Sequence, residues 1–291
     1  MQCRLCPHKC GTYKDNKTSG GICNVSATPK VARIAPHLWE EPCLSGTKGS
    51  GAIFFSGCTM KCIYCQNSEI SAENFGVEIT PQILAEEYKK LEKQGVHNID
   101  LISATQYLPA VLKSFEIYKP SIPIVYNCGG YERVETLKAL DGIVDIYLPD
   151  FKYSDNALAK EYSGVENYVE TATNAIKEML RQTGNLQVNS DGIAEKGVLV
   201  RHLVLPNHTK NSIGVINILK ENFGENITLS LMGQYTPHHK AKDHPKLCRK
   251  ITKREYEKVL NHLIDSDLDG FAQELKSADE RYIPHWDYKN K

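Results

Sequence analysis

Three closely spaced cysteines carry the clearest chemical signal in this sequence. Cys58, Cys62 and Cys65 stand at the spacing C-x3-C-x2-C, with Tyr64 directly before the third cysteine. Soft thiolates close together favour zinc or an iron–sulfur cluster. Four cysteines coordinate a four-iron cluster completely, whereas three leave one iron free to bind another molecule. The count of three therefore indicates a reactive iron–sulfur centre, with a zinc knuckle as the alternative.

The surroundings of this loop favour the iron–sulfur interpretation. A zinc knuckle needs a fourth ligand nearby, but the next sulfur or imidazole side chains are His97 and Cys128, which are distant in the sequence. Residues 51–56, directly before the loop, are apolar between glycines and predict a short buried strand. Because a motif is tested by its structural context, a loop that follows a strand supports a cluster at this position.

A second group of cysteines lies at the start of the chain. Cys3, Cys6, Cys10 and Cys23 have the spacing C-x2-C-x3-C-x12-C. Four thiolates on one short segment predict a closed metal site, either zinc or a second iron–sulfur cluster. The segment has few apolar residues, so a bound metal would have to hold it folded. The alternative is a set of free surface thiols.

Composition narrows the class of protein. The chain has 291 residues, 41% of them hydrophobic, and 35 basic residues balance 35 acidic ones. This balance gives no indication of a nucleic-acid partner, and neither a membrane span nor a signal-peptide core is expected. We therefore expect a cytoplasmic protein, in which ten cysteines favour metal ligation over disulfides.

Apolar strands and amphipathic helices alternate along most of the chain. Strands are predicted near residue 54 and at 99–103, 122–126, 143–148, 198–205 and 227–231, with a short closing strand at 270–272. Helices are predicted from residue 80 to 95, around 108–115, 132–140, 169–180 and 213–219, and at 252–264. This alternation predicts an α/β fold with a parallel sheet. We expect an open six-unit (β/α)6 partial TIM barrel in residues 51–291, preceded by a metal-binding segment and connector in residues 1–50.

Polar residues at the ends of these strands are the candidate site residues. In barrels of this kind, active-site groups collect at the carboxyl ends of the strands. The rule selects Thr105, Gln106, Asn127, Asp150, Lys152, Arg201 and Gln234. The alternative for a single polar residue after a strand is a turn former or a helix cap.

Asp150 and Lys152 form the most informative pair among these candidates. In an extended backbone, residues two apart place their side chains on the same face. An ammonium group can hold a carboxylate, and an aspartate can hold an amino group or a cation. The alternative is an ordinary ion pair at the end of a strand.

The cysteine loop resembles that of the radical S-adenosylmethionine (SAM) superfamily. Over nearly its whole length, the chain is similar to the branch that resembles pyruvate formate-lyase activating enzyme. This similarity rests on residues 39–43, 54–58, 65–67, 145–152, 201–206 and 234–237. It implies an oxidoreductase in which the free iron of a 4Fe-4S cluster binds SAM, and one electron converts SAM to a 5′-deoxyadenosyl radical.

The resemblance also implies roles for individual residues. Cys58, Cys62 and Cys65 would be the catalytic cluster ligands, Lys152 would contact SAM, and Asp150 would help to bind a cation. The full set of expected cofactor-binding residues is Tyr64, Thr105, Gln106, Asn127, Asp150, Lys152, Arg201 and Gln234. A flavodoxin- or ferredoxin-type protein would donate the electron.

The chain departs from the family pattern at two places. Superfamily members often carry Gly-Gly-Glu after the second strand, where this chain has Ala104-Thr105-Gln106, which offers hydrogen bonds without a negative charge. Activating enzymes carry an acid after the third strand, where this chain has Asn127. The ferredoxin-like insert of some activating enzymes is missing after the cluster loop.

The expected function is hydrogen abstraction from a substrate by a deoxyadenosyl radical. A glycine on a partner protein is the favoured substrate. The first alternative is another peptide or a small molecule, enclosed by the N-terminal cysteine segment and the tail around residues 281–286. The second is a non-catalytic module in which both cysteine groups bind metal structurally.

Overall fold

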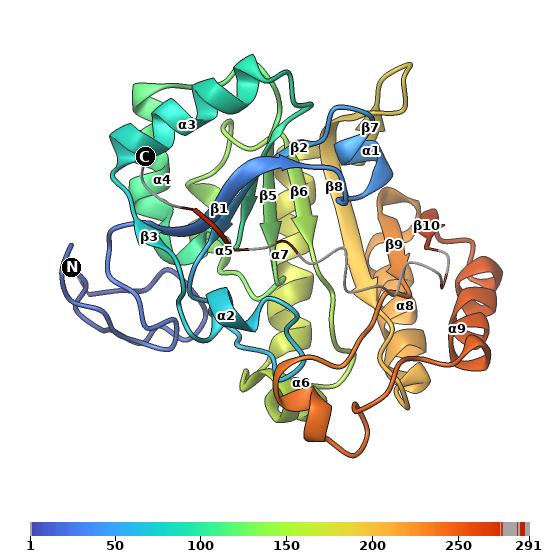
Figure 1. Cartoon of the computed structure of the whole chain (residues 1–291). Helices are drawn as coiled ribbons and strands as arrows, with labels where there is room; N and C mark the ends of the chain where they lie inside the picture. Colours follow the sequence, from blue (N-terminus) through green and yellow to red (C-terminus); the bar gives the residue numbers. More distant parts are fainter. Residues whose placement is uncertain (1, 274, 276–283, 285, 289–291) are drawn as a thin grey trace.

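A ten-stranded sheet forms the centre of the molecule, in a computed structural model that describes residues 2–273, 275, 284 and 286–288 (Figure 1). The strands are β1 (Lys30–His37), β2 (Ser50–Phe55), β3 (Val77–Glu78), β4 (Ile99–Ile102), β5 (Ile124–Cys128), β6 (Ile146–Pro149), β7 (Gln187–Val188), β8 (Ala194–Leu203), β9 (Thr228–Met232) and β10 (Gly270–Ala272). The helices are α1 (Pro42–Ser45), α2 (Ser68–Ser71), α3 (Pro81–Lys93), α4 (Leu108–Ile117), α5 (Val134–Lys138), α6 (Asn156–Ser163), α7 (Tyr168–Thr183), α8 (Thr209–Phe223) and α9 (Lys253–Asp265). Short 3-10 turns are η1 (Thr105–Tyr107), η2 (Gly224–Asn226) and η3 (His239–Asp243).

The predicted strands lie side by side in parallel. The strand order is β10-β9-β8-β6-β5-β4-β2-β1-β3, and every pair from β2 to β10 along this path is parallel. The closing strand occupies the predicted residues and pairs with β9. Because β10 and β3 stand at opposite ends of the order, the sheet is open within the described residues. The α/β class and the parallel sheet are confirmed.

Further strands extend the sheet. β1 pairs antiparallel with both β2 and β3. It lies inside the segment predicted to be a connector, so this part of the chain extends the sheet. β3 and β7 have two residues each, too few for an alternating pattern to appear.

Local sequence signals explain where the helices begin. Thr80 accepts a hydrogen bond from the Ile83 amide, and Pro81 occupies the first turn of α3, as predicted. Thr252 and Glu255 form a reciprocal capping box at the start of α9, which satisfies amide groups that have no partner inside the helix.

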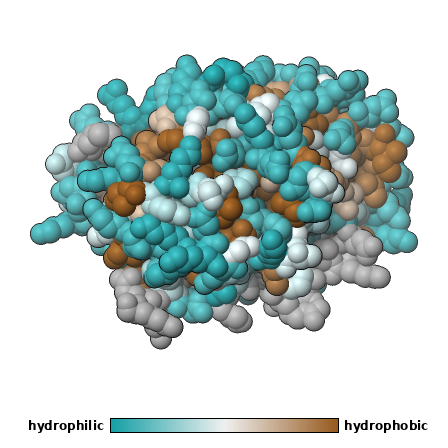
Figure 2. All heavy atoms as spheres, turned by 90° about the horizontal axis from the view of Figure 1, so that it is seen from above, coloured by the Kyte–Doolittle hydropathy of each residue, from teal (hydrophilic) through white to brown (hydrophobic). Residues whose placement is uncertain are grey.

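The core lies on both sides of the central strands. All residues of β2, β4, β5, β6 and β9 are buried, as expected for parallel strands covered on both faces. On the face seen in Figure 2, hydrophilic residues predominate and hydrophobic ones form separate patches. No helix among the described residues has both the length and the apolar character of a transmembrane span.

Candidate functional site

The cysteine loop begins where β2 ends, and side chains of η1 hold its first residues. The Gln106 amide group donates to the carbonyls of Ser56 at 3.0 Å and Gly57 at 2.9 Å. The Tyr107 hydroxyl also donates to the Ser56 carbonyl, at 3.0 Å. Gly57 has φ +78°, which glycine adopts without a steric cost. The turn after β4 therefore fixes the point where the loop leaves the sheet.

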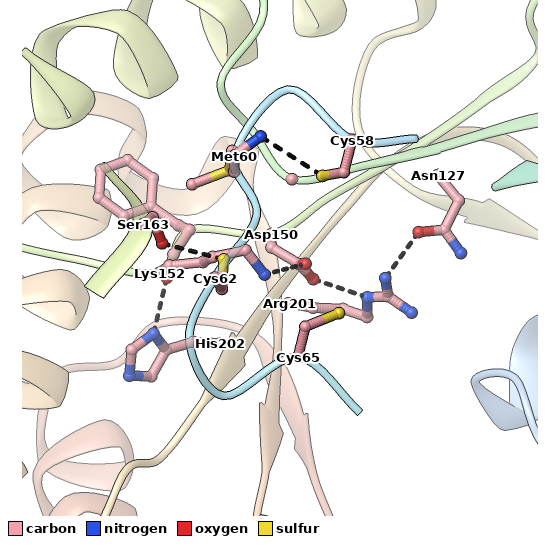
Figure 3. Close-up of polar contacts among 12 residues, drawn as sticks. Cys58, Met60, Cys62, Cys65, Asn127, Asp150, Lys152, Ser163, Arg201 and His202 are labelled. Atoms are coloured by element: carbon pink, nitrogen blue, oxygen red, sulfur yellow. Dashed lines mark hydrogen bonds and ion pairs between the residues drawn. The ribbon is translucent and has the colours of Figure 1, made fainter. Parts of the chain in front are cut away.

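Each of the three loop sulfurs accepts a hydrogen bond from the protein, and Figure 3 shows those to Cys58 and Cys62. The donors are the Met60 amide to Cys58 at 3.4 Å, the Ser163 hydroxyl to Cys62 at 2.9 Å and the Ser71 hydroxyl to Cys65 at 3.3 Å. Hydrogen bonds to sulfur stabilise negative charge there and tune the potential of a bound cluster. No sequence motif marks the two serines, because they contact the loop only in three dimensions.

Tyr64 connects the loop to the adjacent helix α6. Its hydroxyl pairs with that of Tyr153 at 2.8 Å, and Tyr153 pairs in turn with Ser163 at 2.6 Å. Since Ser163 donates to Cys62, one chain of hydroxyl groups joins Tyr64 to a loop sulfur. The Ile63 amide also donates to the Tyr162 carbonyl at 2.8 Å. These contacts fix the middle of the loop.

A cavity of about 250 Å³ opens beside the loop at the carboxyl ends of the strands. The predicted residues that line it are Cys58, Cys62, Tyr64, Cys65, Asn127, Asp150, Lys152, Arg201 and Gln234. Thr105 and Gln106 are absent from this lining. Gln106 holds loop carbonyls, and Thr105 donates to Glu132 at 2.7 Å and pairs with the Tyr126 hydroxyl at 2.9 Å. The structure therefore brings together all but two of the predicted catalytic and cofactor-binding residues.

Asp150 lies between two cations in this cavity (Figure 3). Its carboxylate contacts the Lys152 ammonium at 2.5 Å and the Arg201 guanidinium at 3.1 Å. Burial alone would raise the pKa of Asp150, but Lys152 and Arg201 lower it below its usual value. Burial opposes the charge of Lys152, but Asp150 raises the pKa of that ammonium. All three groups are therefore charged at neutral pH.

Arg201 extends this network toward β5 and the segment between β1 and α1. It contacts the Glu40 carboxylate at 3.1 Å and donates to the Asn127 side-chain oxygen at 2.7 Å. Glu41, the neighbour of Glu40, is buried and accepts from Ser230 at 2.9 Å. Both glutamates line the cavity. Both glutamates lie in residues 39–43, which contributed to the family similarity, but no sequence pattern predicted that they would line this cavity.

Residues outside the cavity hold the Asp150–Lys152 segment in position. The Tyr168 hydroxyl accepts from the Lys152 amide at 2.8 Å and donates to the Asp150 carbonyl at 3.0 Å. His202 is fully buried and its Nδ1–H donates to the Phe151 carbonyl at 2.6 Å. Burial lowers the pKa of His202 to about 4, so the imidazole is neutral. Sequence reasoning missed these residues because each acts through the backbone of a distant strand.

Comparison with known proteins decides the family. Residues 52–214 match the Radical SAM superfamily. The sequence is also 31% identical over 267 residues to "Uncharacterized protein MJ0674" of Methanocaldococcus jannaschii, covering 89% of this chain and 73% of that protein. The chain belongs to the radical SAM superfamily. Membership implies a 4Fe-4S cluster and SAM as cofactors of this radical SAM protein.

Solved structures share the fold of this radical SAM protein at low sequence identity. SuiB from Streptococcus suis, bound to precursor peptide SuiA, is 12% identical with a TM-score of 0.51 and covers 76% of this chain. A radical SAM methyltransferase from Sphaerobacter thermophilus is 11% identical with a TM-score of 0.51 over 76% of this chain. The matched regions amount to 48% of the SuiB chain and 65% of the methyltransferase chain. These likenesses establish the fold.

The donor set of the radical SAM protein fits its implied cofactors. Three thiols face an open cavity that also presents a lysine, an arginine and an aspartate. A methyl group at Gly129 would lie 2.7 Å from the Met60 sulfur, so glycine there keeps room beside the loop. Burial raises the pKa of Cys58, and it raises that of Cys65 to about 12. The thiols would therefore lose their protons as the cluster forms.

Across residues 2–273 and the few described beyond them, no three histidine, cysteine, aspartate or glutamate side chains form a preorganised metal site. Of the N-terminal cysteines, Cys3, Cys6 and Cys23 are buried and Cys10 is exposed. The predicted second metal site of this radical SAM protein thus remains a prediction.

Part of the expected C-terminal lid lies at the cavity of the radical SAM protein. Pro284 lines the cavity, and the Trp286 ring packs against Phe54 with ring centres 5.3 Å apart. The Tyr288 amide donates to the Ala32 carbonyl at 2.9 Å, which places this segment along β1. Residues 281–283 and 285, also expected in the lid, lie outside the described residues.

Proposed function

We propose that this radical SAM protein binds a 4Fe-4S cluster through Cys58, Cys62 and Cys65, and SAM in the cavity beside them. The observation that carries the proposal is the convergence of these three thiols with Asp150 and Lys152 on one cavity. When bound, cluster and SAM supply an electron and a 5′-deoxyadenosyl radical that removes hydrogen from a substrate. Three protein ligands leave one iron open for SAM.

The charged residues of the cavity have distinct roles in this proposal. Lys152 binds the carboxylate of SAM, because an ammonium on a flexible stem suits a carboxylate partner. Asp150 keeps Lys152 in the cavity, and Arg201 holds Asp150 from the opposite side. Asn127 and Gln234 offer uncharged hydrogen-bonding groups to the bound ligand. Tyr168 and His202 position the backbone of residues 150–152 without facing the cavity themselves.

We further propose a glycyl or other backbone position on a partner protein as the site of hydrogen abstraction. Support comes from the similarity to activating enzymes at the cysteine loop and at Asp150-x-Lys152. The open sheet is a second argument, since an open side admits a loop of a folded partner. SuiB, which shares the fold, was solved with a precursor peptide, so a peptide is the alternative substrate class.

The first test is anaerobic incubation of the reconstituted protein with SAM and a reductant, followed by measurement of 5′-deoxyadenosine. The proposal requires 5′-deoxyadenosine from the native chain and from a Cys248→Ser variant, because Cys248 is an exposed thiol outside both cysteine groups. The proposal is wrong if the reconstituted native chain leaves SAM intact.

The second test concerns the substrate and uses a glycyl-radical protein as partner. Activation predicts a persistent protein radical in electron paramagnetic resonance, formed with stoichiometric consumption of SAM. If a peptide or metabolite extract instead drives repeated turnover while no partner gains a radical, the activating role is wrong. SAM cleavage would still stand in that case.

A further inference from the structure

We propose that Cys3, Cys6, Cys10 and Cys23 form a second metal site, a four-thiolate centre that docks the N-terminal segment onto the radical SAM loop. The site lies outside the cavity and serves a different purpose from the three-cysteine set. Backbone turns, contacts of the cysteine sulfurs and the small number of buried apolar side chains in residues 2–28 support this site. None of these depends on the proposed reaction.

Two backbone features bring the first three cysteines together. The Cys3 amide donates to the Thr12 carbonyl at 2.9 Å, and the Gly11 amide donates to the Cys3 carbonyl at 3.1 Å. Between these paired residues the chain reverses direction, and the Lys9 amide donates to the Cys6 carbonyl at 3.0 Å. A tight turn between paired segments is how short metal-binding loops present several thiols to one point.

A second turn adds Cys23 to this group. The Asn24 amide donates to the Gly21 carbonyl at 3.1 Å, and Gly20 bridges to Val25. A methyl group on Gly21 would come within 2.9 Å of the Cys10 sulfur. Because Gly21 also has φ +70°, glycine is needed there for both backbone conformation and space. The turn that carries Cys23 therefore packs directly against the Cys10 sulfur.

A buried lysine contacts this cluster of sulfurs. The Lys14 ammonium, 8% exposed, donates to the Cys23 sulfur at 2.9 Å. Four thiolates around a divalent metal carry a net negative charge, which Lys14 would offset. This contact is independent of the cysteine spacing.

The segment has little else to hold it folded. Among residues 2–28, the buried hydrophobic side chains are Cys3, Cys6, Cys23 and Val25. Its β pairing is limited, among the described residues, to the isolated bridges Gln2 to Tyr13 and Gly20 to Val25. A core made mostly of cysteines gains much of its stability from a metal, as in other small metal-dependent segments. Zinc and a 4Fe-4S cluster both suit four thiolates.

The segment rests directly on the catalytic loop. The His8 imidazole is 2.8 Å from the Thr59 carbonyl, inside the three-cysteine loop. A methyl group on Gly57 would lie 3.0 Å from the Cys23 carbonyl, and the Asn74 amide donates to the Asn24 carbonyl at 2.7 Å. Figure 1 shows the N-terminal segment beside the part of the chain that leads to α2. A metal at the N-terminal site would therefore hold this segment against the three-cysteine loop.

This test measures metal at the N-terminal site in a variant that lacks the three loop cysteines. In a Cys58→Ala/Cys62→Ala/Cys65→Ala variant, purified after growth with zinc and iron, elemental analysis should still find a tightly bound metal. Zinc in an equimolar amount identifies a zinc site, and iron with inorganic sulfide identifies a cluster. Adding Cys10→Ser and Cys23→Ser should remove this metal, whereas adding Cys248→Ser should leave it. The proposal is overturned if the triple variant holds no metal, or if the metal persists without Cys10 and Cys23.

A spectroscopic measurement guards against variants that lose metal because they misfold. Titration of the metal-free triple variant with Co²⁺ alone should produce thiolate-to-cobalt charge-transfer absorption and the visible bands of tetrahedral coordination. Circular dichroism of each variant establishes whether the barrel is folded. A triple variant that is folded but shows no thiolate–cobalt absorption would contradict the proposal. Because these chains cannot assemble the catalytic cluster, the outcome is separate from any result on SAM cleavage.

Discussion

The two cysteine groups use the same side chain in different surroundings. Cys58, Cys62 and Cys65 follow the central strand β2 and face a cavity with charged residues from neighbouring strands. The N-terminal cysteines lie on a segment with few other buried residues, and they face one another and Lys14. In our proposals, the first group offers three thiols beside space for a small molecule, whereas the second offers four thiols, of which three are buried and Cys10 is exposed.

This difference shows that ligand count and position have to agree before chemistry is assigned. A set of three thiols is reactive only where another molecule can reach the open coordination position, and the carboxyl edge of a parallel sheet provides that access. A set of four outside the sheet stabilises local structure instead. The predictions below separate the two regions, beginning with the largest effect.

Loss of any one ligand should abolish the function of the first group. Cys62→Ala removes one of only three protein ligands, so 5′-deoxyadenosine formation should fall to background in anaerobic assays. Cys248→Ser should retain full activity, because that thiol is exposed and belongs to neither group. A Cys62→Ala protein that cleaves SAM at the native rate would show that the loop does not hold the reactive cluster.

Removal of Arg201 should destabilise the cavity far more than removal of a surface arginine. Arg201→Met leaves Asp150 and Glu40 without their shared partner, and both side chains are largely buried. We expect the free energy of unfolding to fall by about 3 kcal/mol in chemical denaturation.

Arg181 offers the matched control for this change. Its pair with Asp141 is about half exposed on both sides, and its second partner, Glu178, is buried but also accepts from Gln182. Glu178 therefore keeps a hydrogen bond in Arg181→Met, and we expect a loss of about 1 kcal/mol. Equal losses for the two variants would show that the Arg201 network has no special energetic role.

Glu132, a buried carboxyl group, should make stability depend on pH. It accepts a hydrogen bond from Thr105, and burial raises its pKa from 4.5 to about 8. The folded protein thus holds a proton that the unfolded chain has lost, so stability should fall as pH rises from 4.5 to 8. The contribution is at most ~1.4 kcal/mol per pH unit. Glu132→Gln should flatten this slope in denaturation series, and parallel slopes for both proteins would contradict the assignment.

Lys152→Ala should weaken SAM binding while the cluster remains. Loss of one ammonium contact to a carboxylate is expected to raise the Kd for SAM by about tenfold, or ~1.4 kcal/mol, in anaerobic equilibrium binding. Iron content should stay at the native level. Lys160→Ala is the control, because Lys160 pairs with Glu166 on the surface. If affinity is unchanged and only stability falls, Lys152 and Asp150 form a structural ion pair.

The smallest effect concerns the contact between the two regions. His8→Ala removes the hydrogen bond to the Thr59 carbonyl and should lower the free energy of unfolding by about 1 kcal/mol. His262→Ala, at an exposed pair with Asn217, should have a smaller effect. The docking of the N-terminal segment would be in doubt if His8→Ala were the milder of the two.

The sequence revealed the parts of this fold that depend on local patterns. Apolar strands, amphipathic helices and the cap at Thr80 all follow from neighbouring residues, and the parallel sheet followed from their alternation. The polar residues at strand ends also converged, because parallel strands present their carboxyl ends at one edge. β3 and β7 were missed because two residues give no periodicity.

Contacts between segments that are distant in the chain could not be predicted from the sequence. Thr105 and Gln106 stand where the family pattern led us to expect SAM ligands, but Thr105 pairs with Glu132 and Gln106 with loop carbonyls. Glu40 reaches Arg201 across the sheet, and Ser163 reaches Cys62 from α6. Such pairs depend on side-chain packing in three dimensions, which no spacing in one sequence encodes.

The central claim is that the three-cysteine loop holds a cluster with one iron open to SAM. The most direct test is electron paramagnetic resonance of the reduced Cys10→Ser/Cys23→Ser protein, in which the N-terminal site makes no contribution, recorded with and without SAM. We predict a cluster signal that changes shape when SAM is added and that disappears when Cys62→Ala is also present. A cluster signal that saturating SAM leaves unchanged would contradict the claim.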